Sequence, residues 1–415
     1  MTTSILEDKD IVCLAFPSWD GNYEKSTVKI MSQLAKRNRV LYIDYPYTYK
    51  DIFTTWFGKQ NAPVGRMLGT QKRLRKISLP ESAFIHVLTT PPVLSVNSVK
   101  NAAKHRRLLQ TNGNIVRKSI LKAMKSLGMK DPLVVCAFNP FLGLPLLNQL
   151  NELATIYYCY DEISACNWTK NYGKQLEEEY IKKADTIIVS SDGLLKSKSS
   201  LSNKCYLVKN GVDFAIFNRT AELRQRNKNV DITVGYLGSL DERVDYELLM
   251  YLAEKLPDIK FEFVGRIISK DKAAQLDKFP NTKFWDAKKP EELPSYLKKF
   301  DAGIIPFLKN EQTAGIYPMK INEYLAGGIP VISTDFSPLP EFDSVIATAS
   351  THEAFLQAMM ESLCNDTPQK RKERISIAAG NSWENKATQF SQAIADTLMR
   401  KNAVKPVVAA VSVSV

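Results

Sequence analysis

The chain has 415 residues, of which 44% are hydrophobic, 10% aromatic and 24% charged. This length predicts two domains, and the composition excludes an intrinsically disordered chain. No run of about 18 or more apolar residues occurs, so no transmembrane helix is expected. The acidic, polar residues 1–10 do not resemble a secretory signal. Six cysteines without a CxxC pair predict a reducing, cytoplasmic compartment and neither a disulfide framework nor a metal site.

The net charge of +12 is concentrated in one segment. Residues 1–220 hold 31 basic and 18 acidic residues, whereas 221–415 hold 25 and 26. Within the first half, 59–130 alone contains 15 basic residues and one acidic residue, Glu81. Such a segment attracts the phosphates of anionic lipid, of a lipid-linked pyrophosphate or of nucleic acid. A solvated basic face is the alternative interpretation.

Two dense clusters of cations lie in this basic segment, at Lys72–Lys76 and Lys104–Arg107. We expect the segment to dock the protein on an anionic membrane, with neighbouring apolar side chains inserting shallowly. The candidate insertion residues are Met67, Leu74, Leu108 and Leu109.

Strand-like apolar runs alternate with amphipathic stretches through the whole chain. In the first half the expected strands are Ile11–Phe16, Val40–Asp44, Phe84–Leu88, Leu133–Ala137, Thr155–Cys159 and Thr186–Ser190, with helical stretches at Thr27–Arg37 and Asn114–Leu127. In the second half the expected strands are Ile232–Leu237, Lys260–Val264, Ala302–Pro306 and Gly328–Ser333. This alternation predicts βαβ units, and therefore an α/β protein with two doubly wound, Rossmann-like domains.

The polar stretch Arg219–Asp231 has no apolar periodicity and is expected to separate the domains. Ser382 can cap a last helix that carries Glu384 in its first turn. The residues after this helix are β-prone but isolated, which favours a loosely ordered tail. The predicted segments are 1–220, 221–381, the helix 382–401 and the tail 402–415.

Two glycine loops follow strands of the second half. Gly238 and Ser239 come directly after one strand, and Gly265 and Arg266 after the next. Glycine lets backbone N–H groups approach a pyrophosphate, and the arginine can reach phosphate or ribose. A tight turn without a ligand is the alternative. Neither loop has the GxGxxG pattern of dinucleotide-binding proteins, which disfavours a dehydrogenase, and no Walker lysine follows.

The strongest local signal is the stretch 313–331. Pro318 suits the first helical position and the Gly327–Gly328 pair suits the end, which predicts a helix over 318–326. Ahead of it, free backbone amides can bind an anion; the expected residues are Ala314, Gly315, Ile316 and Tyr317. Lys320 and Glu323 share one helix face, which fits a phosphate and a ribose diol, or alternatively a surface ion pair.

Several stretches together resemble the retaining "group 1" glycosyltransferases of the GT-B fold, particularly bacterial envelope-polysaccharide enzymes. The stretches are Lys183–Ser191, Val208–Asp213 with Phe217, Gly235–Arg243, Phe263–Gly265, Phe300–Pro306 and 317–331. Their order and spacing are similar to those of the family over roughly residues 155–335. The resemblance implies an N-terminal acceptor-binding domain, a C-terminal nucleotide-sugar-binding domain, and a C-terminal helix that crosses back to the first domain.

The same resemblance assigns roles in the donor site. Glu323 matches the family's glutamate that contacts the donor ribose, whereas the sugar-contacting glutamate eight positions earlier is replaced by Gly315. Backbone amides of 314–317 are therefore expected to hold more of the donor. The family's phosphate-binding cations correspond to Arg243 and to Lys320 or Arg266.

In the first half, the resemblance implies an acceptor site at the ends of strands. The candidates are Trp19, Asp20 and Gly21 after the first strand, and Asp161 and Glu162 after the fifth. Trp19 can stack on a sugar, and Asp161 or Glu162 can bind or orient the acceptor hydroxyl. The alternatives are that Trp19 covers a core and that Asp161 caps a helix.

The predicted activity is transfer of a sugar from a nucleotide sugar, such as a UDP- or GDP-sugar, to a lipid-linked or polysaccharide acceptor. It would serve cell-envelope or exopolysaccharide biosynthesis at the inner face of the cytoplasmic membrane. No DxD motif stands at a strand end, so we expect no metal and no further cofactor, with Arg243, Arg266 and Lys320 stabilising the leaving phosphate. Asp161, Arg243 and Lys320 are the candidate catalytic residues, and retention of configuration follows from the resemblance.

A sugar-nucleotide epimerase or hydrolase on the same fold is the alternative enzyme. A nucleic-acid-binding protein is disfavoured, because the basic segment lacks interleaved aromatic residues and contains no RRM or helix-turn-helix pattern.

Overall fold

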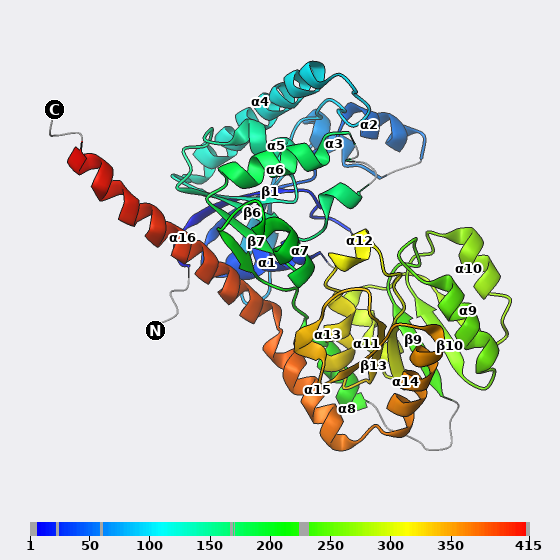
Figure 1. Cartoon of the computed structure of the whole chain (residues 1–415). Coiled ribbons are helices and arrows are strands. Elements are labelled where there is room, and N and C mark those ends of the chain that lie inside the picture. Colours follow the sequence, from blue (N-terminus) through cyan, green and yellow to red (C-terminus); the bar gives the residue numbers. More distant parts are fainter. Residues whose placement is uncertain are drawn as a thin grey trace. The chain divides into compact units, whose positions relative to one another are not determined.

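The computed structural model describes residues 6–21, 25–58, 61–166, 169, 171–223 and 232–411. The chain forms two compact units (Figure 1). The first extends to Val208 and also includes the chain from Ala387 onward, and the second contains Lys209–Lys386. The chain thus enters the second unit upstream of Arg219–Asp231, where the sequence predicts the boundary. Of that stretch, 224–231 lie outside the described residues.

An eight-stranded sheet forms the centre of the first unit, within the described residues, in the order β3-β4-β2-β1-β5-β6-β7-β8. Its strands are β1 (Asp10–Ala15), β2 (Arg39–Ile43), β3 (Leu74–Ser78), β4 (Phe84–Leu88), β5 (Leu133–Ala137), β6 (Ala154–Cys159), β7 (Thr186–Val189) and β8 (Cys205–Leu207). All neighbours pair in parallel except β3 and β4. The inner strands are continuous apolar runs because helices cover both faces of the sheet.

The helices of the first unit connect these strands. They are α1 (Ser26–Leu34), α2 (Tyr49–Trp56), α3 (Val64–Leu68), α4 (Ala102–Leu127), α5 (Pro140–Leu146), the 3-10 helix η1 (Ile163–Ala165), α6 (Gly173–Lys183) and α7 (Asp192–Ser199). Helix α4 begins earlier than the predicted Asn114, with Asn101 as its N-cap. Its Gly113 is a packing position, since a Cβ there would lie 2.5 Å from Pro145 of α5.

Two of the apolar residues expected to insert into a membrane are instead part of the core. Met67 is fully buried against Tyr47 and Ile52, and Leu109 is 4% exposed. Leu74 and Leu108 are half-buried and pack against core clusters. The predicted insertion residues are therefore wrong for Met67 and Leu109, because each fills space beneath its own helix.

The second unit contains a parallel six-stranded sheet, within the described residues, in the order β11-β10-β9-β12-β13-β14. Its strands are β9 (Thr233–Leu237), β10 (Lys260–Val264), β11 (Thr282–Trp285), β12 (Ala302–Ile305), β13 (Val331–Thr334) and β14 (Ile346–Ala349). Two α/β domains with parallel sheets thus confirm the predicted fold class.

Helices cover both faces of this second sheet. One group packs together and contains α8 (Phe214–Leu223), α11 (Pro294–Leu297), α13 (Met319–Ala326) and α15 (Pro368–Gly380). The other contains α9 (Tyr246–Lys255), α10 (Lys270–Leu276) and α14 (His352–Cys364) (Figure 1). Short segments complete the unit: η3 (Pro290–Glu292), α12 (Glu311–Ala314) and η4 (Pro340–Phe342).

The last helix, α16 (Trp383–Val411), begins in the second unit and continues into the first. Trp383 is 1% exposed and lies on Gly211, where an added Cβ would approach its ring to 2.9 Å. Further along, Phe390 packs edge-on against Tyr158 of β6 at 5.4 Å. The predicted crossing helix is confirmed. It continues past 402, where the sequence predicts a loose tail, and 412–415 lie outside the described residues.

Among the helices of the described ranges, none combines the length and the apolar character needed to cross a membrane.

Candidate functional site

The strand order of the second unit fixes where a ligand would bind. The first strand of this unit, β9, pairs with β10 on one side and with β12 on the other, so the order of strands reverses between β9 and β12. In open α/β sheets, ligands bind at the carboxyl ends of the strands at such a reversal. The loops that begin at Gly238 and at Pro306 meet this position.

The two predicted glycine loops approach each other closely at this edge. Gly238 and Gly265 have φ angles of 140° and 155°, which side chains rarely allow. A Cβ on Gly265 would lie 2.0 Å from the carbonyl oxygen of Gly238. A Cβ on Gly238 would lie 2.9 Å from Nζ of Lys320. Both glycines are therefore required by packing, and one of them makes room for a cation.

The side chain of Lys320 extends from α13 toward two aromatic rings near the end of β9. Its Nζ lies 4.8 Å from the ring centre of Tyr236 and 4.6 Å from that of Phe307. Burial and, after it, the nearby charge of Arg243 together lower the pKa of Lys320 to about 7. Ring faces stabilise an ammonium group only partly, so this lysine would gain from a bound anion.

Arg243 supplies a second cation next to Lys320. Its guanidinium lies 5.6 Å from the ring centre of Phe307 and donates to both carboxylate oxygens of Asp241, with Nε at 2.9 Å from Oδ1. Burial favours the neutral form of Asp241, but the hydrogen bonds from Arg243 lower its pKa overall. Asp241, which the sequence did not suggest, fixes the orientation of Arg243. The third predicted cation, Arg266, is exposed, with Nη2 3.4 Å from Oγ of Ser239.

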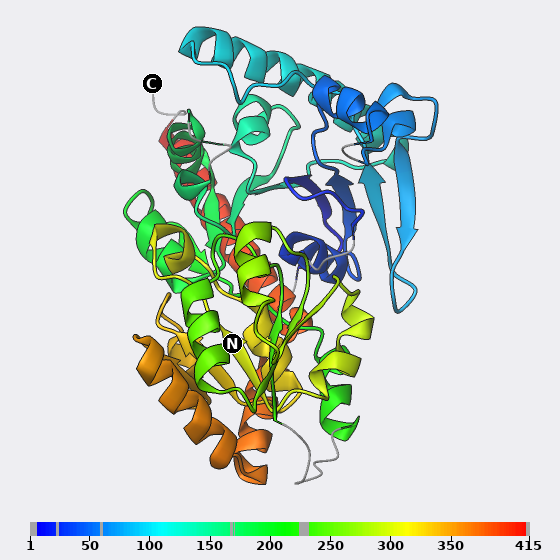
Figure 2. The ribbon, with the colours of Figure 1, turned by 90° about the vertical axis from the view of Figure 1, so that its right-hand side faces the viewer.

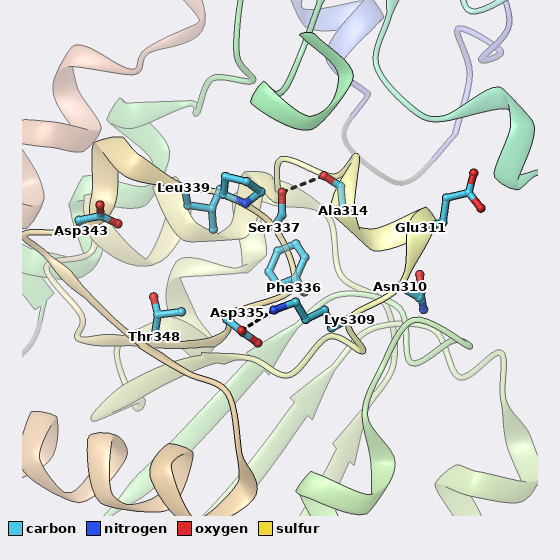
Figure 3. A pocket seen from close by; sticks show the side chains of 11 residues that line it. Lys309, Asn310, Glu311, Ala314, Asp335, Phe336, Ser337, Leu339, Asp343 and Thr348 are labelled. Atoms are coloured by element: carbon cyan, nitrogen blue, oxygen red, sulfur yellow. Dashed lines mark hydrogen bonds and ion pairs between the residues drawn. The ribbon is translucent and has the colours of Figure 1, made fainter. Parts of the chain in front are cut away.

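An open pocket of about 610 Å³ adjoins this cation cluster, which we define as Arg243, Lys320 and the ring of Phe307 that both contact. The pocket lies beyond the carboxyl ends of β12 and β13, and Figure 3 shows the side chains that line it. Phe336 in its wall contacts Phe307 edge-on at 5.1 Å. Lys309 and Asp335 form an ion pair of 2.6 Å on the pocket surface. The rings of Phe307 and Phe336 are both buried, so the wall of the pocket packs directly against the cation cluster.

The segment before α13 differs in part from its prediction. Helix α13 ends at Gly327–Gly328 as predicted, but a separate short helix, α12, precedes it. The amide of Ile316 donates to the carbonyl of Thr313 at 2.9 Å, and that of Ala314 donates to Asn310 at 2.9 Å. These two amides are thus used within the chain and do not offer the open anion cradle that was expected. Gly315 is the C-cap of α12.

Two further predicted donor residues are buried. Tyr317 is 3% exposed, its carbonyl accepts from Asn210 at 3.0 Å and its hydroxyl accepts from Asn322 at 3.2 Å. Its side chain therefore anchors the segment and is not presented as a ligand contact. Glu323 is 8% exposed and lies close enough to Lys320 to raise the pKa of that lysine.

The predicted acceptor residues of the first unit lie beyond β1 and β6. Trp19 is half-buried and packs edge-on against Tyr42 at 5.2 Å, while its amide donates to Asp44 at 2.8 Å. Asp20 forms ion pairs with Arg66 at 2.8 Å and Arg75 at 3.1 Å. The next residue, Gly21, has a φ of 142°. The structure thus brings these three residues together as one loop.

A buried lysine missed by sequence reasoning fixes this loop. Lys25 is 7% exposed and donates to the carbonyls of Ser18 and Asp20, at 2.5 and 2.6 Å. Burial lowers the pKa of Lys25, while the charges of Asp44 and Asp20 oppose the shift. A lone lysine before a helix carries no recognisable motif, so the sequence gave no signal for this role.

Glu162 belongs to a buried ion network and is not an open acceptor-binding carboxylate. Lys198 donates to Glu162 at 2.7 Å and to Glu177 at 2.9 Å. The side chains of Lys198 and Glu177 are almost fully buried. Hydroxyls of Ser164 and Ser197 complete the contacts of Glu162. The prediction for Glu162 is therefore corrected: it caps η1 inside the unit. Asp161 stays half-buried at the strand end, and its Oδ1 accepts from the amide of Glu162 at 2.9 Å.

An aromatic series that the sequence did not single out crosses the same strand ends. Phe16 contacts Tyr45 at 5.6 Å and Phe138 at 6.1 Å, and Phe138 contacts Tyr160 at 4.9 Å. Phe138 has a φ of 54°, a conformation that costs energy for an aromatic residue and is concentrated at functional sites. These residues follow different strands, so only the sheet topology brings them together.

Part of the second unit is similar to a known family of proteins. Residues 231–365 match the model of the family described as "Glycosyl transferases group 1". A Bacillus subtilis (strain 168) protein, named as a teichuronic acid biosynthesis glycosyltransferase, TuaH, is 27% identical over 219 residues. This match covers 48% of the present chain and 55% of the relative, so the chain corresponds to about half the length of that protein.

Solved structures are similar over nearly the whole chain. Sucrose-phosphate synthase from Thermosynechococcus elongatus has a TM-score of 0.69 at 15% identity, over 95% of this chain and 100% of that one. Anabaena HepE, solved with UDP and glucose, has a TM-score of 0.59 at 15% identity, over 95% and 100%. The chain has the GT-B fold. Within this GT-B fold the cation cluster lies in the C-terminal domain, and the aromatic series lies in the N-terminal one.

Proposed function

We propose that the chain is a glycosyltransferase that transfers a sugar from a nucleotide sugar, such as a UDP- or GDP-sugar, to an acceptor. The observation that carries the proposal is the cation cluster at the strand reversal of the second unit. A pyrophosphate leaving group needs positive charge fixed in a site of low polarity. Lys320 and Arg243 supply it, both against the ring of Phe307, and Glu323 lies one helical turn from Lys320.

The donor would place its diphosphate at the cluster and its sugar toward the adjoining pocket. Arg243 and Lys320 would stabilise the departing diphosphate without a metal ion, and Glu323 would hold the ribose diol. The glycine loop at Gly238 and Ser239 would lie along the nucleotide. The missing glutamate at Gly315 leaves sugar recognition to the residues of the pocket.

The acceptor would bind at the strand ends of the first unit, with Trp19 and the aromatic series stacking on sugar rings and Asp161 orienting the acceptor hydroxyl. The match with a teichuronic acid glycosyltransferase supports a lipid-linked or polysaccharide acceptor of the cell envelope. In this proposal the enzyme retains the anomeric configuration of the donor sugar. It acts at the inner face of the cytoplasmic membrane.

The test is product analysis with and without acceptor. The enzyme would be incubated with UDP- and GDP-sugars, alone and with a lipid-linked saccharide extract, and the released nucleoside diphosphate would be measured. The proposal expects release that depends on the acceptor, with a glycosylated product. Equal release from the donor alone would support the alternative hydrolase, and a changed donor sugar would support an epimerase.

A further inference from the structure

The helix α2 of the first unit presents an uncovered aromatic face. Tyr49, Phe53, Trp56 and Phe57 are 49%, 56%, 66% and 77% exposed. The first three follow one another at spacings of four and three residues, so they lie on one side of the helix. Phe53 and Trp56 contact each other edge-on at 5.7 Å. So many large aromatic side chains on one short helix mark a surface that is covered by a partner.

The opposite side of α2 is firmly attached to the unit. Ile52 is 5% exposed and packs with Tyr47 and Met67 in a small core cluster. A capping box fixes the start of the helix, with the amide of Thr48 donating to Asp51 at 2.6 Å. The aromatic face is thus held outward by a fixed helix. Figures 1 and 2 both place α2 and α3, in blue, at the margin of the first unit.

The charges around this face favour one kind of partner. Residues 49–78 contain seven basic residues and one acidic residue, Asp51, whose carboxylate is used by the capping box. Lys50 next to the aromatic face is exposed, as is Lys72 between α3 and β3, whereas the ammonium group of Lys76 lies 3.7 Å from the ring centre of Phe84. On α3, Leu68 adds a further exposed apolar side chain, at 50%. Aromatic residues flanked by cations are typical of surfaces that lie in the headgroup region of an anionic bilayer.

We infer that α2 is the element that docks this protein on an anionic membrane, with Phe53, Trp56 and Phe57 entering the headgroup region and Lys50 and Lys72 facing the lipid phosphates. These residues take the place of Met67 and Leu109, which are buried. The inference extends the proposed function by naming how the enzyme reaches a lipid-linked acceptor, but it rests on the α2 surface alone and not on the donor site.

The test is co-sedimentation of the full chain with vesicles, without any donor. Phosphatidylcholine vesicles are compared with vesicles that contain phosphatidylglycerol, at low and high salt. The triple variant Phe53→Ser, Trp56→Ser, Phe57→Ser should bind the anionic vesicles about 1000-fold more weakly than wild type, because transfer of each of the three large apolar side chains from water contributes a factor of roughly ten. The control triple Leu153→Ser, Ile232→Ser, Met399→Ser changes exposed apolar residues elsewhere and should bind as wild type does.

Fluorescence gives a second readout that does not depend on the triple variant. Trp56 should shift its emission to the blue on anionic vesicles, and Trp56→Phe should keep the binding but lose most of the shift. Wild-type binding that salt does not weaken, or equal binding by the aromatic triple variant, would overturn the inference. Self-association that the aromatic triple variant abolishes would also overturn it and assign the face to a second copy. Nucleotide binding by the triple variant is unchanged in every case, so a failure here is separate from a failure of the proposed function.

Discussion

Lys320 gives the proposed donor site a pH dependence that follows from its surroundings. Burial and the charge of Arg243, opposed by that of Glu323, lower the pKa of its ammonium group to about 7. A bound pyrophosphate places negative charge beside Nζ and favours the protonated form. Donor binding therefore takes up a proton when the pH lies above 7 but below the pKa of the bound state. Affinity should fall as the pH rises.

The size of the effect follows from proton linkage. If the diphosphate returns the pKa of Lys320 to its ordinary value of about 10.4, the Kd rises about tenfold per pH unit above 7 and about 100-fold between pH 6 and pH 9. Calorimetric titration with an intact nucleotide sugar measures this, because both phosphates of such a donor are esterified and do not titrate in that range.

Lys320→Arg is the matched control, because a guanidinium remains charged throughout this range. Its Kd should be nearly constant from pH 6 to pH 9. A wild-type Kd that does not change over the same range, or that changes equally in Lys320→Arg, would refute the assignment of Lys320 to the diphosphate.

Three further predictions address other groups. Glu323→Ala should raise the donor Kd about 10- to 100-fold, since a hydrogen bond to a charged group contributes roughly 1.5–3 kcal/mol; an unchanged Kd in a normally folded variant would exclude Glu323 from the site. Lys198→Met should lower the free energy of unfolding by about 3–5 kcal/mol at neutral pH, because Glu162 and Glu177 become uncompensated buried carboxylates. In urea denaturation this loss should shrink toward pH 5, where those carboxylates take up protons, and wild-type stability would contradict the network's role. Transfer activity should persist in excess EDTA, and a loss that manganese or magnesium restores would show that the fixed cations do not suffice.

The strands that could be predicted from the sequence are the inner ones. The runs at β1, β2 and β5 are nearly or fully apolar because neighbouring strands and helices cover them. The missed strands are β3, β8, β11 and β14, and these are the edges of the two sheets. Edge strands are short and half-exposed, so they lack the continuous apolar run that reveals an inner strand. In β3 the edge consists largely of the cluster Lys72–Lys76, which the sequence predicts to be a basic surface that docks on a membrane.

Part of the proposed donor site could also be predicted from the sequence. Gly238, Gly265 and Lys320 stand in short local patterns, and the structure brings Gly238 and Lys320 into contact. The roles of Asp241, Phe307 and Lys25 could not be predicted from the sequence, because they depend on which loops meet at a strand end. Glu162 was misassigned for a related reason. A glutamate after a strand looks the same in sequence whether it faces a ligand or a buried lysine, and Lys198 lies far along the chain.

The most direct test of the proposed donor site is calorimetric binding of UDP- and GDP-sugars at neutral pH to wild type and to the double variant Arg243→Met, Lys320→Met. Removal of both cations leaves the sheet and the glycine loops in place, and circular dichroism would verify the fold. The account predicts that wild type binds one of the two donor classes and that the double variant loses at least about 100-fold in affinity, since charge-assisted contacts to a phosphate contribute roughly 1.5–3 kcal/mol each. Binding of neither class by wild type, or equal affinity in the double variant, would contradict it.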